Sequence, residues 1–171
     1  MDRLARVWLL LIQIVLGYEW LSSGLRKLET GGQFVAGLPQ TLARFAEKNP
    51  YPWMKAFLTG PATANATLFG NLVPWGEVLA GLGLIAGALY LLFLARRLNG
   101  VLQRVAGILV AIALLGGMTM NAIFGLAAGH TSPSTAGLNL VMFFSQAMLL
   151  GFWIGVILQP VEEIALRRRP A

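Results

Sequence analysis

Charged residues are scarce in this chain of 171 residues, and cysteine is absent altogether. Only 12% of the residues are Asp, Glu, Lys or Arg, whereas 57% are hydrophobic. Because a soluble domain carries about 25% charged residues, the deficit indicates a membrane protein. The lack of cysteine excludes dithiol chemistry within the chain. The length favours a single domain over residues 1–171.

Acidic residues are outnumbered by basic ones, with 7 Asp and Glu against 13 Lys and Arg and a formal net charge of +6. Such an excess also occurs in nucleic-acid-binding proteins. Here, however, the basic residues lie at the ends of apolar runs, which is typical of signals that orient membrane helices. We therefore interpret the charge as a topology signal and predict no nucleic-acid partner.

Four apolar segments are long enough for helices that cross about 30 Å of hydrocarbon, which takes about 20 residues. None shows the strict alternation that transmembrane strands require, so a β-barrel is not favoured. The sequence predicts an all-α integral membrane protein, a four-transmembrane-helix bundle with spans at residues 7–28, 74–94, 103–124 and 138–158. Most basic residues lie at the two termini and between the second and third spans, which predicts cytoplasmic termini (N-in/C-in).

The long outer loop, residues 29–73, is predicted to contain a short amphipathic helix. Its apolar residues recur at spacings of four and three, at Phe34, Leu38, Leu42 and Phe45. Pro39 suits a first helical position, and Pro50 and Pro52 disfavour helix before them. The helix is expected to lie on the outer membrane face or to cap the bundle. An ordered surface loop without a ligand role is the alternative.

Glycine is abundant, and its spacing predicts close packing between helices rather than a nucleotide-binding loop. Three pairs of small residues are spaced four apart: Gly83 with Gly87, Gly151 with Gly155, and Gly107 with Ala111. Such pairs let helix backbones approach closely in lipid. On the first span, Gly17 and Gly24 make one face narrow, and another helix is expected to pack there.

Ionisable and amide side chains are predicted to meet in the outer half of the bundle. These residues are Glu19, Arg26, Lys27, Glu77, Asn121, His130 and Asn139, with Trp20, Trp53 and Trp75 at similar depth. A charge at the bilayer centre costs about 3 kcal/mol on insertion scales, so acids and bases there pair or line a wet cavity. Glu19 and Arg26 lie within about 20° on one helix face, so Glu19 is expected to pair with Arg26 or Lys27. Pairing of Glu77 with one of these cations is the other option.

Each of these residues also has a structural interpretation. The charged cluster can fix helix register without binding a ligand, Glu77 can face head groups, and His130 can be solvated in its loop. Asn121, Asn139 and Gln146 can hydrogen-bond between helices. The tryptophans can anchor the chain at the membrane interface instead of walling a flat aromatic ligand.

Two stretches, "GYEWLSSGLRKL" at 17–28 and "PWGEVLAGLGLIAGAL" at 74–89, resemble the DoxX/DoxD-like family of small four-helix membrane proteins. The features that carry the resemblance are Gly17, an aromatic residue at 18 or 20, Gly24, Lys27, the Gly–Glu pair at 76 and 77, and Gly81, Gly83 and Gly87. "TSPSTAGLNLVMF" at 131–143 also looks like that family. The resemblance covers nearly the whole chain in span order.

The resemblance implies the membrane subunit of a thiosulfate:quinone oxidoreductase, with a DoxA-like or other redox partner, in the cytoplasmic (inner) membrane of a bacterium or archaeon. It also implies a quinone as cofactor. Arg26, Lys27 or His130 would donate hydrogen bonds to it, and Glu19 or Glu77 would relay protons. The same site would also include Trp20, Trp75, Asn121 and Asn139. Since the sequence has no metal-ligand cluster, haem pair or flavin signature, electrons would come from a partner or directly from substrate.

Two other functions stay open on the sequence. A structural or assembly subunit of a larger membrane complex, or a homo-oligomer, would use the glycine faces and the outer loop as contacts. A small transporter or lipid-binding carrier would use a polar cavity between the helices. Transporters often carry internal repeats, and this sequence shows no convincing duplication.

Overall fold

The computed structural model describes residues 3–30, 32–94, 100–129 and 133–158, and the described chain is helical. Four of its helices are long and apolar enough to cross a membrane. They are α1 (Arg3–Glu29), α4 (Ala66–Leu89), α5 (Gly100–Ala128) and α6 (Pro133–Leu158). The prediction of a multi-pass membrane protein with four apolar spans is therefore confirmed by length and composition.

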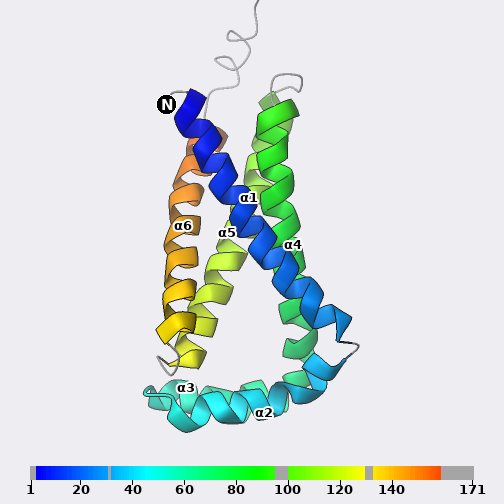
Figure 1. Ribbon diagram of the computed structural model, residues 1–171, viewed down its shortest axis with the longest axis vertical. Helices are drawn as coiled ribbons and strands as arrows, with labels where there is room; N and C mark the ends of the chain where they lie inside the picture. The colour runs from blue at the N-terminus through cyan, green and yellow to red at the C-terminus, as the bar shows by residue number, and fades with distance from the viewer. Residues whose placement is uncertain (1–2, 31, 95–99, 130–132, 159–171) are drawn as a thin grey trace, which may run out of the picture.

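The four spanning helices form a bundle that widens toward one end (Figure 1). α1 packs along α4 and α5 packs along α6, whereas α1 and α6 contact each other at few points. α1 begins and α6 ends at the same end of the bundle, and at the other end α2 (Gln33–Lys48) and α3 (Pro52–Phe57) lie across it (Figure 1). A π-helical turn, η1 (Leu58–Ala62), joins α3 to α4, and another, η2 (Tyr90–Leu94), follows α4.

Glycine sets the distance between α1 and α4. A Cβ on Gly81 would lie 2.5 Å from the Leu21 nitrogen and 2.6 Å from the Gly17 oxygen, both backbone atoms. A Cβ on Gly24 would lie 2.7 Å from the Pro74 oxygen. No side chain fits at such distances, so the expectation that a helix packs on the Gly17 and Gly24 face is confirmed.

Glycine behaves differently on the other spanning helices. A Cβ on Gly83 would lie 2.9 Å from Ala113, and one on Gly107 would lie 2.7 Å from Ile157, so both residues lie in helix contacts. Gly151 and Gly155 have nothing within 4 Å and are exposed. The prediction of packing at this last pair is wrong within the described chain, because that face of α6 is directed outward while Trp153 is directed inward.

Prolines mark helix starts less reliably here than the sequence pattern suggests. α4 begins at Ala66, well before Pro74, and Pro39 lies inside α2 rather than at its first position. Proline is tolerated within membrane helices when neighbouring groups satisfy the freed backbone carbonyl. The spans therefore begin and end at somewhat different residues than predicted.

The apolar core lies in the half of the bundle near the start of α1, and it contains a buried polar pair. Fully buried Leu10, Leu84, Leu114 and Leu149 surround it. Gln13 Nε2 donates a hydrogen bond to the Leu84 carbonyl at 2.7 Å, and Trp153 Nε1 donates to Gln13 Oε1 at 2.7 Å. These bonds join α1 to α4 and α6 and close the bundle at this level.

Candidate functional site

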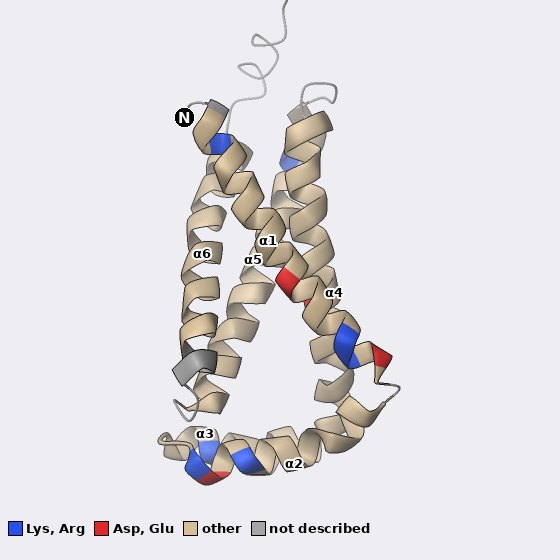
Figure 2. Ribbon diagram, viewed as in Figure 1, with Lys and Arg blue, Asp and Glu red and all other residues tan. Residues whose placement is uncertain are grey.

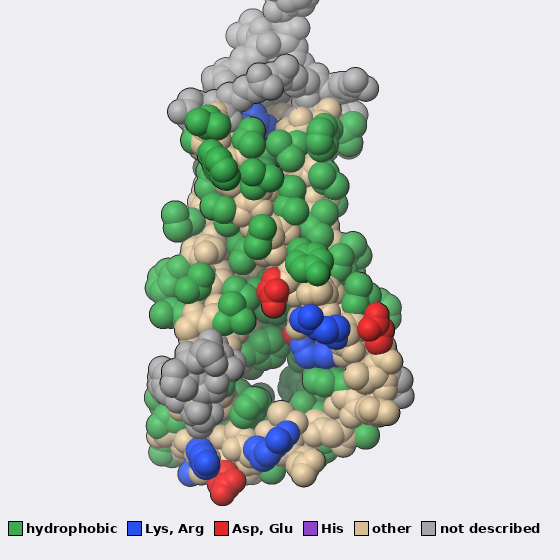
Figure 3. Space-filling view, in the orientation of Figure 1, with side chains coloured by type: hydrophobic (Ala, Val, Ile, Leu, Met, Phe, Trp, Pro, Cys, Tyr) green, Lys and Arg blue, Asp and Glu red, His purple; other side chains and the backbone are tan. Residues whose placement is uncertain are grey.

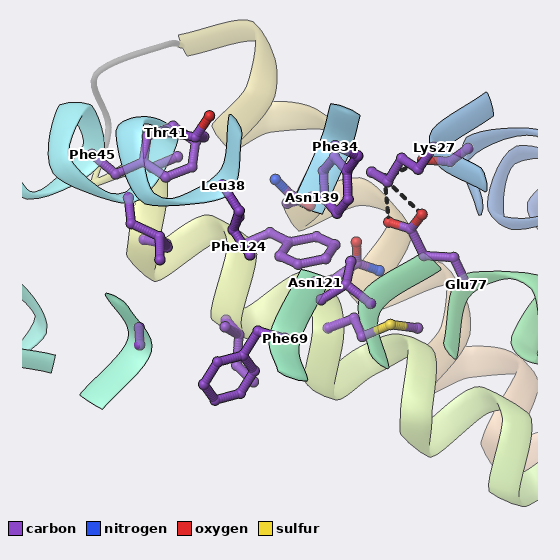
Figure 4. Close-up of a pocket in the computed structure, with 18 of the residues that line it drawn as sticks. Lys27, Phe34, Leu38, Thr41, Phe45, Phe69, Glu77, Asn121, Phe124 and Asn139 are labelled. Carbon is purple, nitrogen blue, oxygen red and sulfur yellow. Dashed lines mark hydrogen bonds and ion pairs between the residues drawn. The ribbon is translucent and has the colours of Figure 1, made fainter. Parts of the chain in front are cut away.

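A cavity of about 460 Å³ lies between α2 and the adjoining parts of the four spanning helices. This volume is within the range of about 300–1,000 Å³ typical of small-molecule sites. Aromatic and aliphatic side chains make most of the wall, including Phe34, Leu38, Phe45, Phe69 and Phe124 (Figure 4). In the space-filling view the surface is hollowed beside the basic residues of α1, above α2 (Figure 3).

One buried ion pair stands in the cavity wall. Lys27 Nζ lies 2.6 Å from both carboxylate oxygens of Glu77 and donates a hydrogen bond to Ser23 Oγ at 2.9 Å. The Glu77 side chain is 1% exposed and that of Lys27 is 26% exposed. Since Gly24 contacts Pro74, α1 and α4 are close at this level. Helical side chains lean toward the N-terminus, which directs Lys27 back to Glu77.

Glu19 and Arg26, which the helix geometry expects to pair, are separate in the structure. The Glu19 carboxylate lines the cavity half-buried, with no ion-pair or hydrogen-bond partner among the described residues. Arg26 is exposed and does not line the cavity. Charged residues of the described chain gather on the later part of α1 and on α2 and α3, so Arg26 lies at an already polar surface (Figure 2).

The other predicted site residues divide between the cavity and the surface. Trp20, Asn121 and Asn139 line the cavity, and Trp20 and Asn121 are buried. Trp75 is 54% exposed and lies away from it, because a residue two positions before Glu77 is about 200° round the helix. Trp53 is exposed too. His130 lies outside the described residues.

Sequence reasoning missed most of the aromatic wall. The apolar stripe of α2 faces the cavity through Phe34, Leu38 and Phe45, whereas the sequence analysis placed this helix on the membrane face or over the bundle and assigned it no part in a ligand site. The expectation that this helix caps the bundle is the part of the sequence analysis that points to its observed position. Asn49 Nδ2 fastens the end of α2 to α5, donating hydrogen bonds to the Leu126 and Ala127 carbonyls at 2.9 Å each.

Comparison of the chain with profiles of protein families, with curated proteins and with solved structures finds no match. Within the described ranges, no group of three or more His, Asp and Glu side chains is placed to hold a metal ion. A proposal on function therefore depends on the chemistry of the cavity and its ion pair.

Proposed function

We propose that this chain is the quinone-binding membrane subunit of an oxidoreductase and that the cavity holds the quinone ring. The observation that supports this most is the cavity lining, which is aromatic and aliphatic around one buried ion pair. Sites for flat, mostly apolar ligands have this character, with a few polar groups that fix orientation. The resemblance of residues 17–28 and 74–89 to the DoxX/DoxD-like family favours the same function.

The chain's own residues have distinct roles in this proposal. Phe34, Phe69 and Phe124 pack against the ring and exclude water. Lys27 already donates to Glu77 and Ser23, so its role is to hold the Glu77 carboxylate in place. Glu19 and Glu77 are the carboxylates at the cavity wall that can hold a proton there.

A bound quinone supplies two-electron redox chemistry. We propose that the electrons come from a partner subunit or from a small reductant such as thiosulfate, as the resemblance implies. The partner would be a DoxA-like or other redox protein.

We further propose that both termini face the cytoplasm, in the inner membrane of a bacterium or archaeon. The distribution of basic residues between the connecting segments supports this orientation. In that orientation α2, α3 and the cavity lie in the outer half of the membrane.

Binding of a decyl-substituted benzoquinone to the detergent-solubilised protein tests the proposed function. Thr41 lines the cavity from α2, so Thr41→Trp should fill part of the space and raise the dissociation constant at least about tenfold, the equivalent of about 1.4 kcal/mol. Ala43 is exposed on the same helix and does not line the cavity, so Ala43→Trp should leave binding unchanged. Equilibrium dialysis measures both. Equal binding by the two variants, or no saturable binding by the unaltered chain, would contradict the proposal.

A further inference from the structure

Three buried polar atoms beside the cavity have no hydrogen-bond partner among the residues that the structure describes. They are Trp20 Nε1 on α1, Asn121 Oδ1 on α5 and Gln146 Nε2 on α6. Their residues are 3%, 2% and 0% exposed, and the side chains of Trp20 and Asn121 line the cavity. Leaving such an atom unpaired is destabilising, and buried polar groups are paired in the great majority of cases. Their concentration at one place indicates a site for a polar group of a ligand.

The two amides hold each other in position. Asn121 Nδ2 donates a hydrogen bond to Gln146 Oε1 at 2.8 Å, which joins α5 to α6. Gln146 Nε2 occupies the space that a Cβ on Gly117 would take, and Trp20 Nε1 lies 3.1 Å from the same point. Gly117 therefore allows both donors to gather against the backbone of α5.

The fold satisfies a comparable group elsewhere. Trp153 is as buried as Trp20, and its indole N–H donates to Gln13 Oε1, while Gln13 donates onward to a carbonyl. That network lies in the closed half of the bundle. The unpaired atoms themselves expose almost no surface, but two of their residues, Trp20 and Asn121, line the cavity, so a ligand there lies next to these side chains.

The three unpaired atoms indicate which group of a ligand can bind beside them. A hydroxyl oxygen can accept hydrogen bonds from Trp20 and Gln146 and donate its own proton to Asn121 Oδ1. If both amides turn by 180°, their mutual bond is kept, Gln146 offers Trp20 an acceptor, and an Asn121 N–H is left without a partner. An oxygen atom of a ligand fits beside these side chains in either arrangement.

We propose that Trp20, Asn121 and Gln146 form a polar floor that binds an oxygen substituent of the ligand's ring, a hydroxyl or a carbonyl. The proposal rests on the proposed function in taking that ring to be a quinone or quinol. It adds the orientation of the ring, with one oxygen directed at the polar floor. It also assigns Gln146 a part in ligand recognition, through the position in which it holds Asn121.

The indole N–H signals of the ¹⁵N-labelled protein in micelles test the polar floor. Decyl-substituted benzoquinone should shift the Trp20 signal, because Nε1 gains an acceptor or its neighbours change. The Trp153 signal should stay in place, since its bond to Gln13 is already made. Decylbenzene, which lacks the ring oxygens, should bind more weakly and shift the Trp20 signal less at saturation.

Variants separate the polar floor from the rest of the cavity. Asn121→Leu should raise the dissociation constant of the quinone probe at least tenfold and leave that of decylbenzene unchanged. Should Asn121→Leu fail to fold, Gly117→Ala displaces the Gln146 amide and should have the same effect. Gly116→Ala is its matched control, because Gly116 is exposed with nothing within 4 Å.

Each outcome bears on one proposal separately. Saturable quinone binding with an unmoved Trp20 signal and an unaffected Asn121→Leu variant overturns the polar floor but keeps the proposed function. A Trp20 signal shifted by decylphenol, with no quinone binding, supports the polar floor and overturns the proposed function. A Trp20 proton in contact with water both before and after saturation with the quinone overturns the polar floor, because a resident water then satisfies it.

Discussion

Replacing Lys27 should destabilise the protein more than replacing Glu77, although the two residues form one ion pair. Glu77 is fully buried, whereas Lys27 reaches the surface in part and also donates to Ser23. In Lys27→Met the carboxylate stays in the interior without a cation. In Glu77→Gln the Lys27 ammonium keeps its hydrogen bond to Ser23 and its partial exposure at the surface. Lys27→Met therefore leaves a buried negative charge, whereas Glu77→Gln leaves a positive charge that reaches the surface.

The magnitudes follow from this difference in burial. Breaking a buried pair so that a charge is left uncompensated costs about 3–5 kcal/mol, the loss expected for Lys27→Met. Glu77→Gln should lose about 1–2 kcal/mol, near the value of a hydrogen bond to a charged group. The double variant should be more stable than Lys27→Met alone, because it leaves no buried charge.

Circular dichroism during unfolding by sodium dodecyl sulfate in mixed micelles measures the free energies of unfolding. Arg26→Gln is the control, since Arg26 is a neighbouring cation that is exposed, and its loss should stay within about 0.5 kcal/mol. Equal losses for the two single variants, or a double variant that loses their sum, would refute the reasoning. So would an Arg26→Gln loss as large as that of Lys27→Met.

Two further predictions concern packing and orientation. Gly81→Ala should lower the free energy of unfolding by about 1–3 kcal/mol, because the methyl group would stand 2.5 Å from the Leu21 nitrogen. Gly151→Ala should not lower it, since nothing lies within 4 Å of that position, and a similar loss for both would contradict close α1–α4 packing. The chain has no cysteine, so single-cysteine variants can be labelled without background. Ala43→Cys should react with an impermeant maleimide in intact cells and Val101→Cys only after permeabilisation; the opposite pattern would contradict cytoplasmic termini.

Most of the fold can be predicted from hydropathy and glycine spacing, because both act locally along a helix. Four spans follow from the length of apolar runs, and the narrow face of α1 follows from Gly17 and Gly24 alone. The spacing of glycines along one helix does not determine which other helix packs against them. Gly151 and Gly155 have the same pattern as Gly83 and Gly87, yet only the latter pair meets α5.

The candidate site was harder to predict, because it depends on register between helices. Glu19 and Arg26 share a face within one helix, and that local geometry favoured their pairing. Lys27 instead reaches Glu77, since the contact of Gly24 with Pro74 brings α4 beside the end of α1. The choice between these partners is a property of two helices together and has no signature in either one.

The cavity can be traced to the same glycine contacts. Gly17, Gly24 and Gly81 hold α1 against α4 along much of its length, while α1 is joined to α6 through Gln13 and Trp153 near its start. Below that bond α1 follows α4 away from α6, and α2 lies across this end of the bundle (Figure 1), where its side chains line the cavity. A substitution that pushes α1 off α4 should therefore change the cavity as well as the stability. Quinone affinity in Gly81→Ala thus reports whether the α1–α4 contact shapes the ligand site.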